Sequence, residues 1–304
     1  MAYLLSDHQY GKAESRMVRI YRDTARHEIR DLNVTTALRG DFAEAYLSGS
    51  QAAVLPTDTQ KNTAFSYTKE KGVATIEQYG LELARHFVSE IEPVSGARIE
   101  IEEFLWERAV IDGVEHDHTW LRKGQEVRTA AITVDATGEY VIAGLKDLII
   151  LKSTGSEFAG FLVDGYTTLP ETHDRVMATA LDVKWRYAAA DGGDVVGGVD
   201  WDGIYASAKA IMVKEFATLQ SLALQQTLWH MGTAVLDAHP EIVEIKLKAP
   251  NKHHFDYDIA RFGVEQKGEV FHADDRPYGL IEATIAREDA PAAHDAWKFS
   301  AGLA

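Results

Sequence analysis

The sequence predicts an α+β protein of two similar units, in which antiparallel sheets carry helices on one face. Segments with alternating apolar residues come in consecutive pairs, as the strands of an antiparallel sheet do. Between these pairs, apolar residues recur at the spacing of one helix face. The order strand, strand, helix, strand, strand occurs twice, with about 150 residues in each copy, which indicates a tandem duplication. We place the two units at residues 1–136 and 137–304.

The first unit consists of two predicted strands, a helix and two more strands. The helix is predicted to begin after Thr75 and to end before Pro93, because the apolar residues between them fall on one face. Thr75 and Gln78 can form a capping box, in which each side chain bonds the backbone N–H of the other residue. The four strands are predicted at residues 10–22, 27–38, 97–109 and 126–135.

The second unit repeats this order with a longer connection. Residues 153–179 separate its first two strands and contain few periodic apolar residues. The longest helix signal in the chain follows, over residues 204–240. The four strands are predicted at residues 140–152, 182–189, 241–248 and 277–288, the third running on toward His254.

Composition limits the chemistry that this chain can perform. Its 304 residues include 31 Lys and Arg, 47 Asp and Glu and no Cys, and the net charge is −16. Without cysteine there is no disulfide, no thiolate-bound zinc and no cysteine nucleophile, so the chemistry rests on oxygen and nitrogen groups. The acidic balance disfavours nucleic acid and anionic membranes as partners and favours a small substrate.

The chain carries no recognisable export or membrane signal. Asp7, His8 and Gln9 lie where a signal peptide needs an apolar stretch, and no run approaches the roughly 18 apolar residues of a membrane span. We therefore expect a cytoplasmic protein. Strands paired in this order leave sheet edges open, and pairing across subunits is one way to cover them, which favours oligomerisation.

Four polar segments are not explained by periodicity, and the first two have simple structural interpretations. Tyr10-Gly11-Lys12 places a lysine at the start of the first strand, where a lone lysine is usually a solvated charge. The segment TDTQKNT, residues 57–63, is typical of a turn with a helix N-cap, because Thr, Asp and Asn bond local backbone groups.

The other two segments offer side chains suited to a planar anion. In the long connection, Arg175 can clamp such an anion and Phe158 can stack on it, although Arg175 can instead pair with Asp174 or Glu171. A loop of this length in a compact domain is often functional. In the segment PNKHHF, strand periodicity places Asn251 and His253 on one face and Lys252 and His254 on the other.

Some segments contain residues that could bind a metal ion or a phosphate group, but their spacing and their neighbours disfavour both kinds of site. The segments EHDH, residues 115–118, and His253-His254 contain possible metal ligands, but no HExxH spacing is present and the first segment lies in a predicted loop beside Gly113. The glycine-rich residues 191–198 lack the Lys-Ser/Thr of a phosphate loop and carry two acids, which predicts a flexible connector.

Several motifs together resemble the urate oxidase (uricase) family. They are YGKAESRMVRIYRD, TARHEIRDLNVTTALRGDF, TDTQKNT, LKSTGSEFAGFLVDGYTTLPETHDR, SLALQQTLWHMG and PNKHHF, and they extend from about Tyr10 to Ile285. The resemblance implies two tandem tunnelling-fold (T-fold) units in each subunit and a barrel-like homotetramer. It also implies an oxidase without cofactor or metal, which converts urate, dioxygen and water to 5-hydroxyisourate and hydrogen peroxide.

The resemblance also assigns roles to individual residues. Lys12, Thr57 and His253 match a catalytic proton relay. Lys12, Thr57 and Asp58 are expected to face the remaining residues from a neighbouring subunit. The expected contacts with urate or dioxygen come from the Thr57-Asp58 backbone, Phe158, Arg175, Leu224, Gln225 and Asn251.

Some features depart from the family, and two other functions remain open. Leu224 replaces a valine of some members, and the chain ends without the S-K-L peroxisomal signal of eukaryotic members, which again favours the cytoplasm. A zinc-dependent tunnelling-fold hydrolase or synthase is disfavoured by the lack of cysteine and of a three-histidine pattern. A purine-binding protein without catalysis is disfavoured because it needs no counterpart of Lys12, Thr57, Asn251 or His253.

Overall fold

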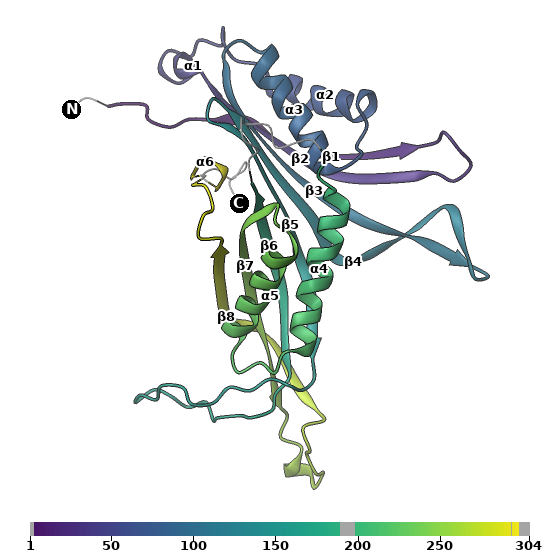
Figure 1. Ribbon diagram of the computed structural model, residues 1–304, viewed down its shortest axis with the longest axis vertical. Helices are drawn as coiled ribbons and strands as arrows, with labels where there is room; N and C mark the ends of the chain where they lie inside the picture. The colour runs from purple at the N-terminus through teal and green to yellow at the C-terminus, as the bar shows by residue number, and fades with distance from the viewer. Residues whose placement is uncertain (1–2, 189–197, 293, 298–304) are drawn as a thin grey trace. The chain divides into compact units, whose positions relative to one another are not determined.

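The computed structural model describes residues 3–188, 198–292 and 294–297 (Figure 1). In this part of the chain, eight strands form a sheet whose order follows the chain from β1 to β8. The chain divides into two compact units. The first comprises Met1–Gly144, Trp185–Asp202 and Asp289–Ala304, and the second comprises Leu145–Lys184 and Gly203–Glu288.

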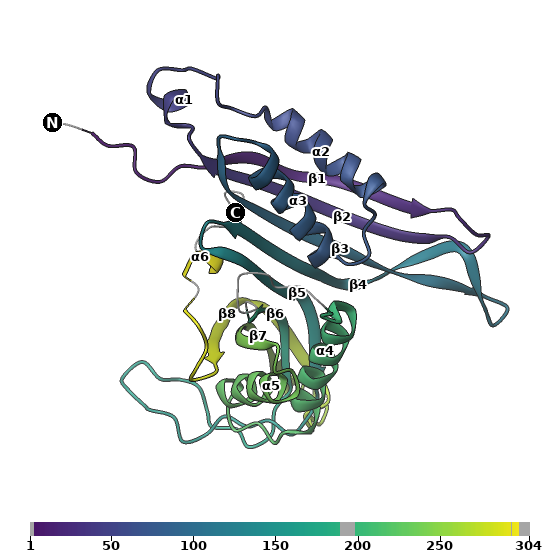
Figure 2. The ribbon, with the colours of Figure 1, turned by 45° about the horizontal axis from the view of Figure 1, so that its top comes forward.

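The first unit is an antiparallel sheet with helices on one face. Helix α3 packs on β3 and β4, and α2 packs on β1, as Figure 2 shows. Apolar side chains of β2, β3 and α3, such as Leu32, Ile99 and Phe87, fill the space between them and are fully buried. The elements are β1 (Tyr10–Tyr21), β2 (Glu28–Gly40), α1 (Ala43–Leu47), α2 (Thr57–Glu70), α3 (Ile76–Glu90), β3 (Val94–Ile111), β4 (Val114–Asp135) and the terminal α6 (His294–Trp297).

The second unit places α5 against β7 and β8. Gly232 permits this close packing, because a Cβ there would lie 2.5 Å from Ile285 Cδ1 and 3.2 Å from Ile245 Cγ2. Strands β5 and β6 run from one unit into the other. The elements are β5 (Gly138–Lys152), β6 (Met177–Tyr187), α4 (Trp201–Thr218), α5 (Leu224–Ala238), β7 (Ile242–Asp256), the 3-10 helix η1 (Ala260–Phe262) and β8 (Phe271–Ala286).

The α+β class is confirmed, as is the cap of α3. Thr75 Oγ1 accepts the backbone N–H of Gln78 at 3.2 Å. The reciprocal half of the capping box is not formed, because the Gln78 side chain donates to Glu82 instead. The predicted boundary between two duplicated units, at residues 136 and 137, stays a prediction. The compact units do not test it, because the first unit contains segments from both halves of the sequence.

Three local predictions are wrong. Residues 57–63 form the first turns of helix α2, whose N-cap is Pro56, and not a turn with a polar cap. The predicted helix over 204–240 is two helices, because Ser221 between them pairs with Ser156 in a β-bridge. Residues 115–118 lie in β4 and not in a loop, since the β3–β4 hairpin turns at Asp112 and Gly113 with positive φ angles of 51° and 81°.

Two further features were not predicted or lie outside the described structure. The short helix α1 gave no periodic signal over its five residues. The predicted glycine-rich connector, residues 191–198, lies outside the described residues except for Gly198. Within the described residues, no helix has both the length and the apolar character needed to cross a bilayer.

Candidate active site

Lys12 lies at a bulge in the β1–β2 ladder. The register passes from Lys12 opposite Thr36 to Ser15 opposite Val34, so β1 has one extra residue, and Glu14 adopts a φ of 55°. At this bulge, two side-chain hydroxyls of β2 accept hydrogen bonds from backbone N–H groups of β1. The Lys12 N–H donates to Thr36 Oγ1 at 3.3 Å, and the Glu14 N–H donates to Thr35 Oγ1 at 2.9 Å. The bulge thus fixes the backbone of Lys12 through side chains as well as through the ladder.

The same Thr36 hydroxyl connects Lys12 to helix α2. It donates to Gln60 Oε1 at 2.7 Å, and both side chains are buried. The Gln60 N–H donates to the carbonyl of Pro56 at 3.1 Å, which closes the first turn of α2. Thr57 and Asp58 stand on that turn. Two hydrogen bonds through Thr36 of β2 therefore connect Lys12 of β1 to the helix that carries Thr57.

Asp58 is exposed and held by its own helix. Its carboxylate accepts hydrogen bonds from Lys61 Nζ and, at 2.9 Å, from Asn62 Nδ2. These two neighbours, with a smaller attraction from the charge of Lys12, lower the pKa of Asp58. Asp58 therefore stays ionised near neutral pH. Thr36 and Gln60 thus connect Lys12 to the helix that carries Thr57 and Asp58, and the shared site of these three residues stays a prediction.

Phe158 and Arg175 form a second group, in the second unit. The Arg175 guanidinium carbon lies 5.4 Å from the centroid of the Phe158 ring. Phe158 also stacks on Phe161, with centroids 4.8 Å apart and an angle of 16° between the rings. Burial lowers the pKa of Arg175, although arginine remains charged at any physiological pH. An aromatic ring and a planar cation are thus fixed side by side.

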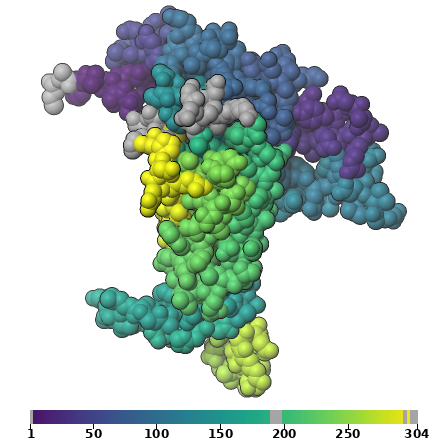
Figure 3. Space-filling model, in the orientation of Figure 1, coloured from purple at the N-terminus to yellow at the C-terminus, as the bar shows by residue number. Residues whose placement is uncertain are grey.

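Short backbone bridges hold this pair in the long connection. The Arg175 N–H donates to the Ser156 carbonyl at 2.8 Å, and Arg175 Nε lies 3.3 Å from Ser156 Oγ. Phe158 and Thr172 exchange two backbone hydrogen bonds of 2.8 and 3.0 Å. The tip of the connection is exposed, with Leu162 at 90% and Tyr166 at 94%, and it projects from the surface in Figure 3. The base is therefore ordered by hydrogen bonds while the tip makes few contacts.

The start of α5 belongs to the same group. The Glu157 N–H donates to the Ser221 carbonyl at 2.8 Å, and the Ser221 N–H donates to the Gly155 carbonyl at 3.0 Å. The Ser221 hydroxyl lies 2.8 Å from Thr227 Oγ1 inside α5. Leu224 and Gln225, the first residues of α5, are thereby fixed relative to the connection. Leu224 is buried, whereas Gln225 is exposed.

Asn251 and His253 lie on β7 at an irregularity of the β7–β8 ladder. Asn251 pairs with Gly279, but His253 pairs with Asp274, so the register shifts between them. The His253 ring stacks on Phe255 at 5.5 Å, as expected for two residues on one face of a strand. The hydrogen bonds and ring contacts that join Phe158, Arg175 and α5 do not include these two residues.

Sequence reasoning missed the residues that position the others, namely Thr36, Gln60, Ser156 and Ser221. All four lie inside the quoted motifs, but the residues that they contact are distant in the sequence. The predicted absence of a metal stays a prediction. Among the described residues, no group of three or more histidine and acidic side chains is arranged to hold a metal ion.

Comparisons with known proteins identify the family of this chain. The Uricase family model matches residues 8–133 and 141–282. A uricase of Arthrobacter globiformis is 48% identical over 300 residues, which cover 99% of this chain and 95% of that protein. A uricase of Schizosaccharomyces pombe is 33% identical over 285 residues, 92% of this chain and 96% of that protein. A crystal structure of uricase from Arthrobacter globiformis matches with a TM-score of 0.91 at 48% identity and covers 98% of this chain and 100% of that chain. The chain therefore belongs to the uricase family.

Proposed function

We propose that this chain oxidises urate with dioxygen and water to 5-hydroxyisourate and hydrogen peroxide, without a cofactor or metal. Family membership supports an oxidoreductase that acts on urate. The observation that carries the proposal is the Phe158–Arg175 pair, with the guanidinium 5.4 Å from the ring centroid. Urate is a planar anion, so an aromatic face and a planar cation with several N–H donors match its shape and charge.

The substrate itself can supply the electrons. Two electrons leave the conjugated purine and reduce dioxygen to the peroxide level, while water provides the hydroxyl group of the product. The protein then has to orient the ring, move protons and hold dioxygen close to it. Arg175, Gln225 and Phe158 would orient the ring, Leu224 would form an apolar wall, and the Thr57-Asp58 backbone would complete the contacts.

Proton transfer would pass through Lys12, Thr57 and His253. A threonine hydroxyl is a weak base alone, but it can pass a proton between two better acid–base groups. The Thr36–Gln60 hydrogen bond supports this role, because it positions Lys12 and the first turn of α2 together. Asn251 would hold dioxygen or water with Thr57, above the plane of the purine.

We further propose a cytoplasmic homotetramer whose sites are shared between subunits. Lys12, Thr57 and Asp58 lie in the first unit, and the other site residues lie in the second. Strands β1 and β8 end the order of the sheet, and pairing such edges with a neighbouring chain would cover them. A barrel-like assembly of T-fold units would use those edges.

The direct test uses protein stripped of metal with a chelator, mixed with urate under air. Urate absorbance should fall while hydrogen peroxide appears in equal amount, at the rate of untreated protein. Thr57→Ala should remove this activity, and Thr59→Ala, on the exposed side of the same helix, is the matched control. Turnover that requires added zinc, or urate binding without turnover, would refute the proposal.

A further inference from the structure

The ends of two hairpins lie side by side in the first unit, at the opposite end of β1 from Lys12. The β1–β2 and β3–β4 hairpins extend in the same direction (Figure 2), and the His27 N–H donates to the Asp117 carbonyl at 3.0 Å. Beside this contact, the rings of His116 and His118 lie next to each other. Neither histidine has a role in the proposed oxidation of urate, so the pair is a separate feature of this unit.

The two histidines lie in a bulge of β4. In the β3–β4 ladder, Arg108 is opposite Trp120, and Val110 is opposite Glu115. Two steps along β3 thus correspond to five along β4, and the three extra residues fall within 116–119. Bulges change the direction of side chains and are frequent near functional sites. The histidines therefore belong to a strand whose backbone departs from the ladder, and not to the predicted loop.

Arg108 fixes the backbone of this bulge. Its guanidinium donates to the carbonyls of His116 and Asp117 at 3.3 and 2.8 Å, and also to the carbonyl of His27. Only 10% of the Arg108 side chain is exposed. One cation thus satisfies three carbonyls of two hairpins and gives the bulge a fixed shape. A pair of ligands that is held in place before binding loses less entropy when it binds an ion.

The geometry of the two rings suits a chelated transition-metal ion. Their centroids are 4.4 Å apart, and their planes are inclined at 86°. Two imidazoles that each bind one ion through a nitrogen about 2.0–2.1 Å away, at neighbouring corners of a square, have centroids roughly 4.5 Å apart. The His118 N–H donates to His116 Nδ1 at 3.5 Å. A hydrogen bond of this length is weak, so an ion can replace it at the same lone pair.

The charges around the pair favour a cation. Glu115 and Asp117 both pair with Arg26, and Glu28 pairs with Arg108. Three carboxylates therefore accompany two guanidinium groups at the ends of these hairpins. The excess of negative charge agrees with the acidic balance of the whole chain and attracts a metal ion to this end of the unit.

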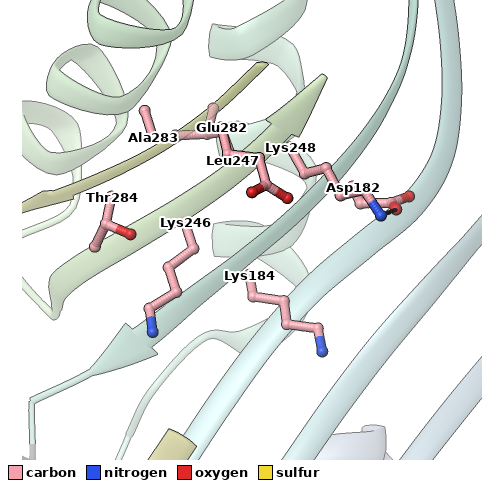
Figure 4. A pocket seen from close by; sticks show the side chains of 8 residues that line it. All are labelled: Asp182, Lys184, Lys246, Leu247, Lys248, Glu282, Ala283 and Thr284. Carbon is pink, nitrogen blue, oxygen red and sulfur yellow. Dashed lines mark ion pairs between the residues drawn. The ribbon is translucent and has the colours of Figure 1, made fainter. Parts of the chain in front are cut away.

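A groove on β6, β7 and β8 lacks these features. It has a volume of about 470 Å³, and its lining contains three lysines, two carboxylates and no histidine (Figure 4). Protonated lysine has no lone pair to offer a metal ion and repels it by its charge. A metal ion is therefore expected at the histidine pair and not in the groove.

The ligand type and the angle between the ligands select the metal. Imidazole suits zinc, copper, iron and nickel, and square coordination by nitrogen is typical of copper(II) and nickel(II), of which copper binds more tightly. Among the described residues there is no group of three or more histidine and acidic ligands, so water fills the other positions. We propose that His116 and His118 chelate one copper(II) ion in the bulge of β4.

Calorimetric titration of metal-free, full-length protein with copper(II) chloride tests this proposal. We expect one tight site in each chain, with nickel(II) and zinc(II) binding more weakly. Electron paramagnetic resonance at one equivalent of copper should show coordination by nitrogen. His116→Gln and His118→Gln should each raise the dissociation constant at least about tenfold. The two losses should not add in the double variant, because loss of either ligand breaks the chelate.

Neighbouring histidines provide matched controls. His27→Gln should bind copper as the wild type does, although its ring centroid lies only 5.9 Å from that of His118. His254→Gln, in the other pair of sequence neighbours, should also bind normally. His118 is exposed, so His118→Gln should leave the free energy of unfolding unchanged and separate loss of the site from loss of the fold. Absence of a tight site, equal binding by wild type and both single variants, or loss of binding in either control would overturn the proposal.

Discussion

The Thr36 hydroxyl donates a hydrogen bond of 2.7 Å to Gln60 Oε1, although the two residues are 24 positions apart in the sequence. The same hydroxyl oxygen accepts the backbone N–H of Lys12. Gln60 lies one helical turn after Pro56, beside Thr57 and Asp58. The positions of two proposed catalytic residues, Lys12 and Thr57, therefore depend on one buried pair that takes no direct part in the proposed chemistry.

Replacing Gln60 by leucine should weaken both the fold and the site. The change leaves the buried Thr36 hydroxyl without its acceptor, which costs about 1–3 kcal/mol of the free energy of unfolding. The kcat for urate should fall more than the affinity for a nonreactive purine analogue, because the relay is displaced while Phe158 and Arg175 are unchanged. Urea denaturation and steady-state kinetics measure the two effects. Exposed Gln51→Leu is the control, and equal stability and kcat in both variants would contradict this role.

Lys12→Met should separate catalysis from binding. Loss of a positioned acid–base group typically slows a reaction by about 10²–10⁴-fold. We expect a fall of that size in kcat, with nearly unchanged binding of the nonreactive analogue by equilibrium titration. Lys69→Met, at the exposed end of α2, is the control for loss of one positive charge. If the analogue loses as much affinity as kcat falls, Lys12 is a binding residue and the relay is wrong.

Mixing two inactive variants tests whether sites are shared between subunits. Lys12→Met and His253→Ala should each be inactive alone. If Lys12 and His253 of one site come from different chains, an oligomer that contains both variants has some sites with both residues intact. Activity should then return after the two proteins are unfolded and refolded together, but not after they are refolded separately. No recovery in verified mixed oligomers would place both residues of a site on the same chain.

Buried charges in the first unit should make stability depend on pH. Glu77 has no exposed surface and accepts two hydrogen bonds from Arg128, at 2.9 and 3.1 Å. Burial raises the pKa of Glu77, and the attraction of Arg128 opposes the shift without cancelling it. A raised pKa in the folded state means that the folded protein holds this proton at pH values where the unfolded chain has lost it. The stability contributed by protonated Glu77 is thus lost as pH rises through the folded pKa.

Glu77→Gln, which imitates the protonated side chain, exposes that dependence. Relative to this variant, the wild type should lose free energy of unfolding as the pH rises from the ordinary glutamate pKa toward neutrality. Urea denaturation over a pH series measures the difference. Glu90→Gln, at the exposed end of the same helix, controls for the removal of one carboxylate. If the free energy of unfolding of the wild type instead rises relative to that of Glu77→Gln as the pH rises, the pKa of Glu77 is lowered in the folded protein.

Strand pairs were predictable from the sequence because alternation reports burial directly, and Thr75 was predictable because capping is local. Helix α2 was not, since its buried side chains are Gln60, Ala64 and Thr68. They have helical spacing but little apolar character, so periodicity of apolar residues does not reveal them. The break between α4 and α5 was missed because apolar periodicity is present where the helix is interrupted. Apolar spacing continues across Ser221, while the backbone there pairs with Ser156.

The proposed site was predictable only in part. Motif order pointed to Lys12, Thr57 and Asp58, whose shared site stays a prediction, and Thr36 and Gln60 connect Lys12 to the helix that carries the other two. The hydrogen bonds that position them depend on register. Thr36 is opposite Lys12 because β1 and β2 pair as they do, with a bulge that no local pattern marks. Contacts that depend on strand register and on pairing between distant residues cannot be predicted before the fold is known.

Gly11, next to Lys12, tests whether that register controls activity. A Cβ at this position would lie 1.8 Å from the carbonyl oxygen of Thr36, which is backbone and cannot move aside without breaking the ladder. Gly11→Ala should therefore cost about 1–3 kcal/mol of the free energy of unfolding, as overpacking does, and should lower kcat by displacing Lys12. Gly165→Ala is the matched control, because no atom lies within 4 Å of its added Cβ. Wild-type stability and kcat in Gly11→Ala, measured by urea denaturation and urate consumption, would show that the β1–β2 register does not position Lys12.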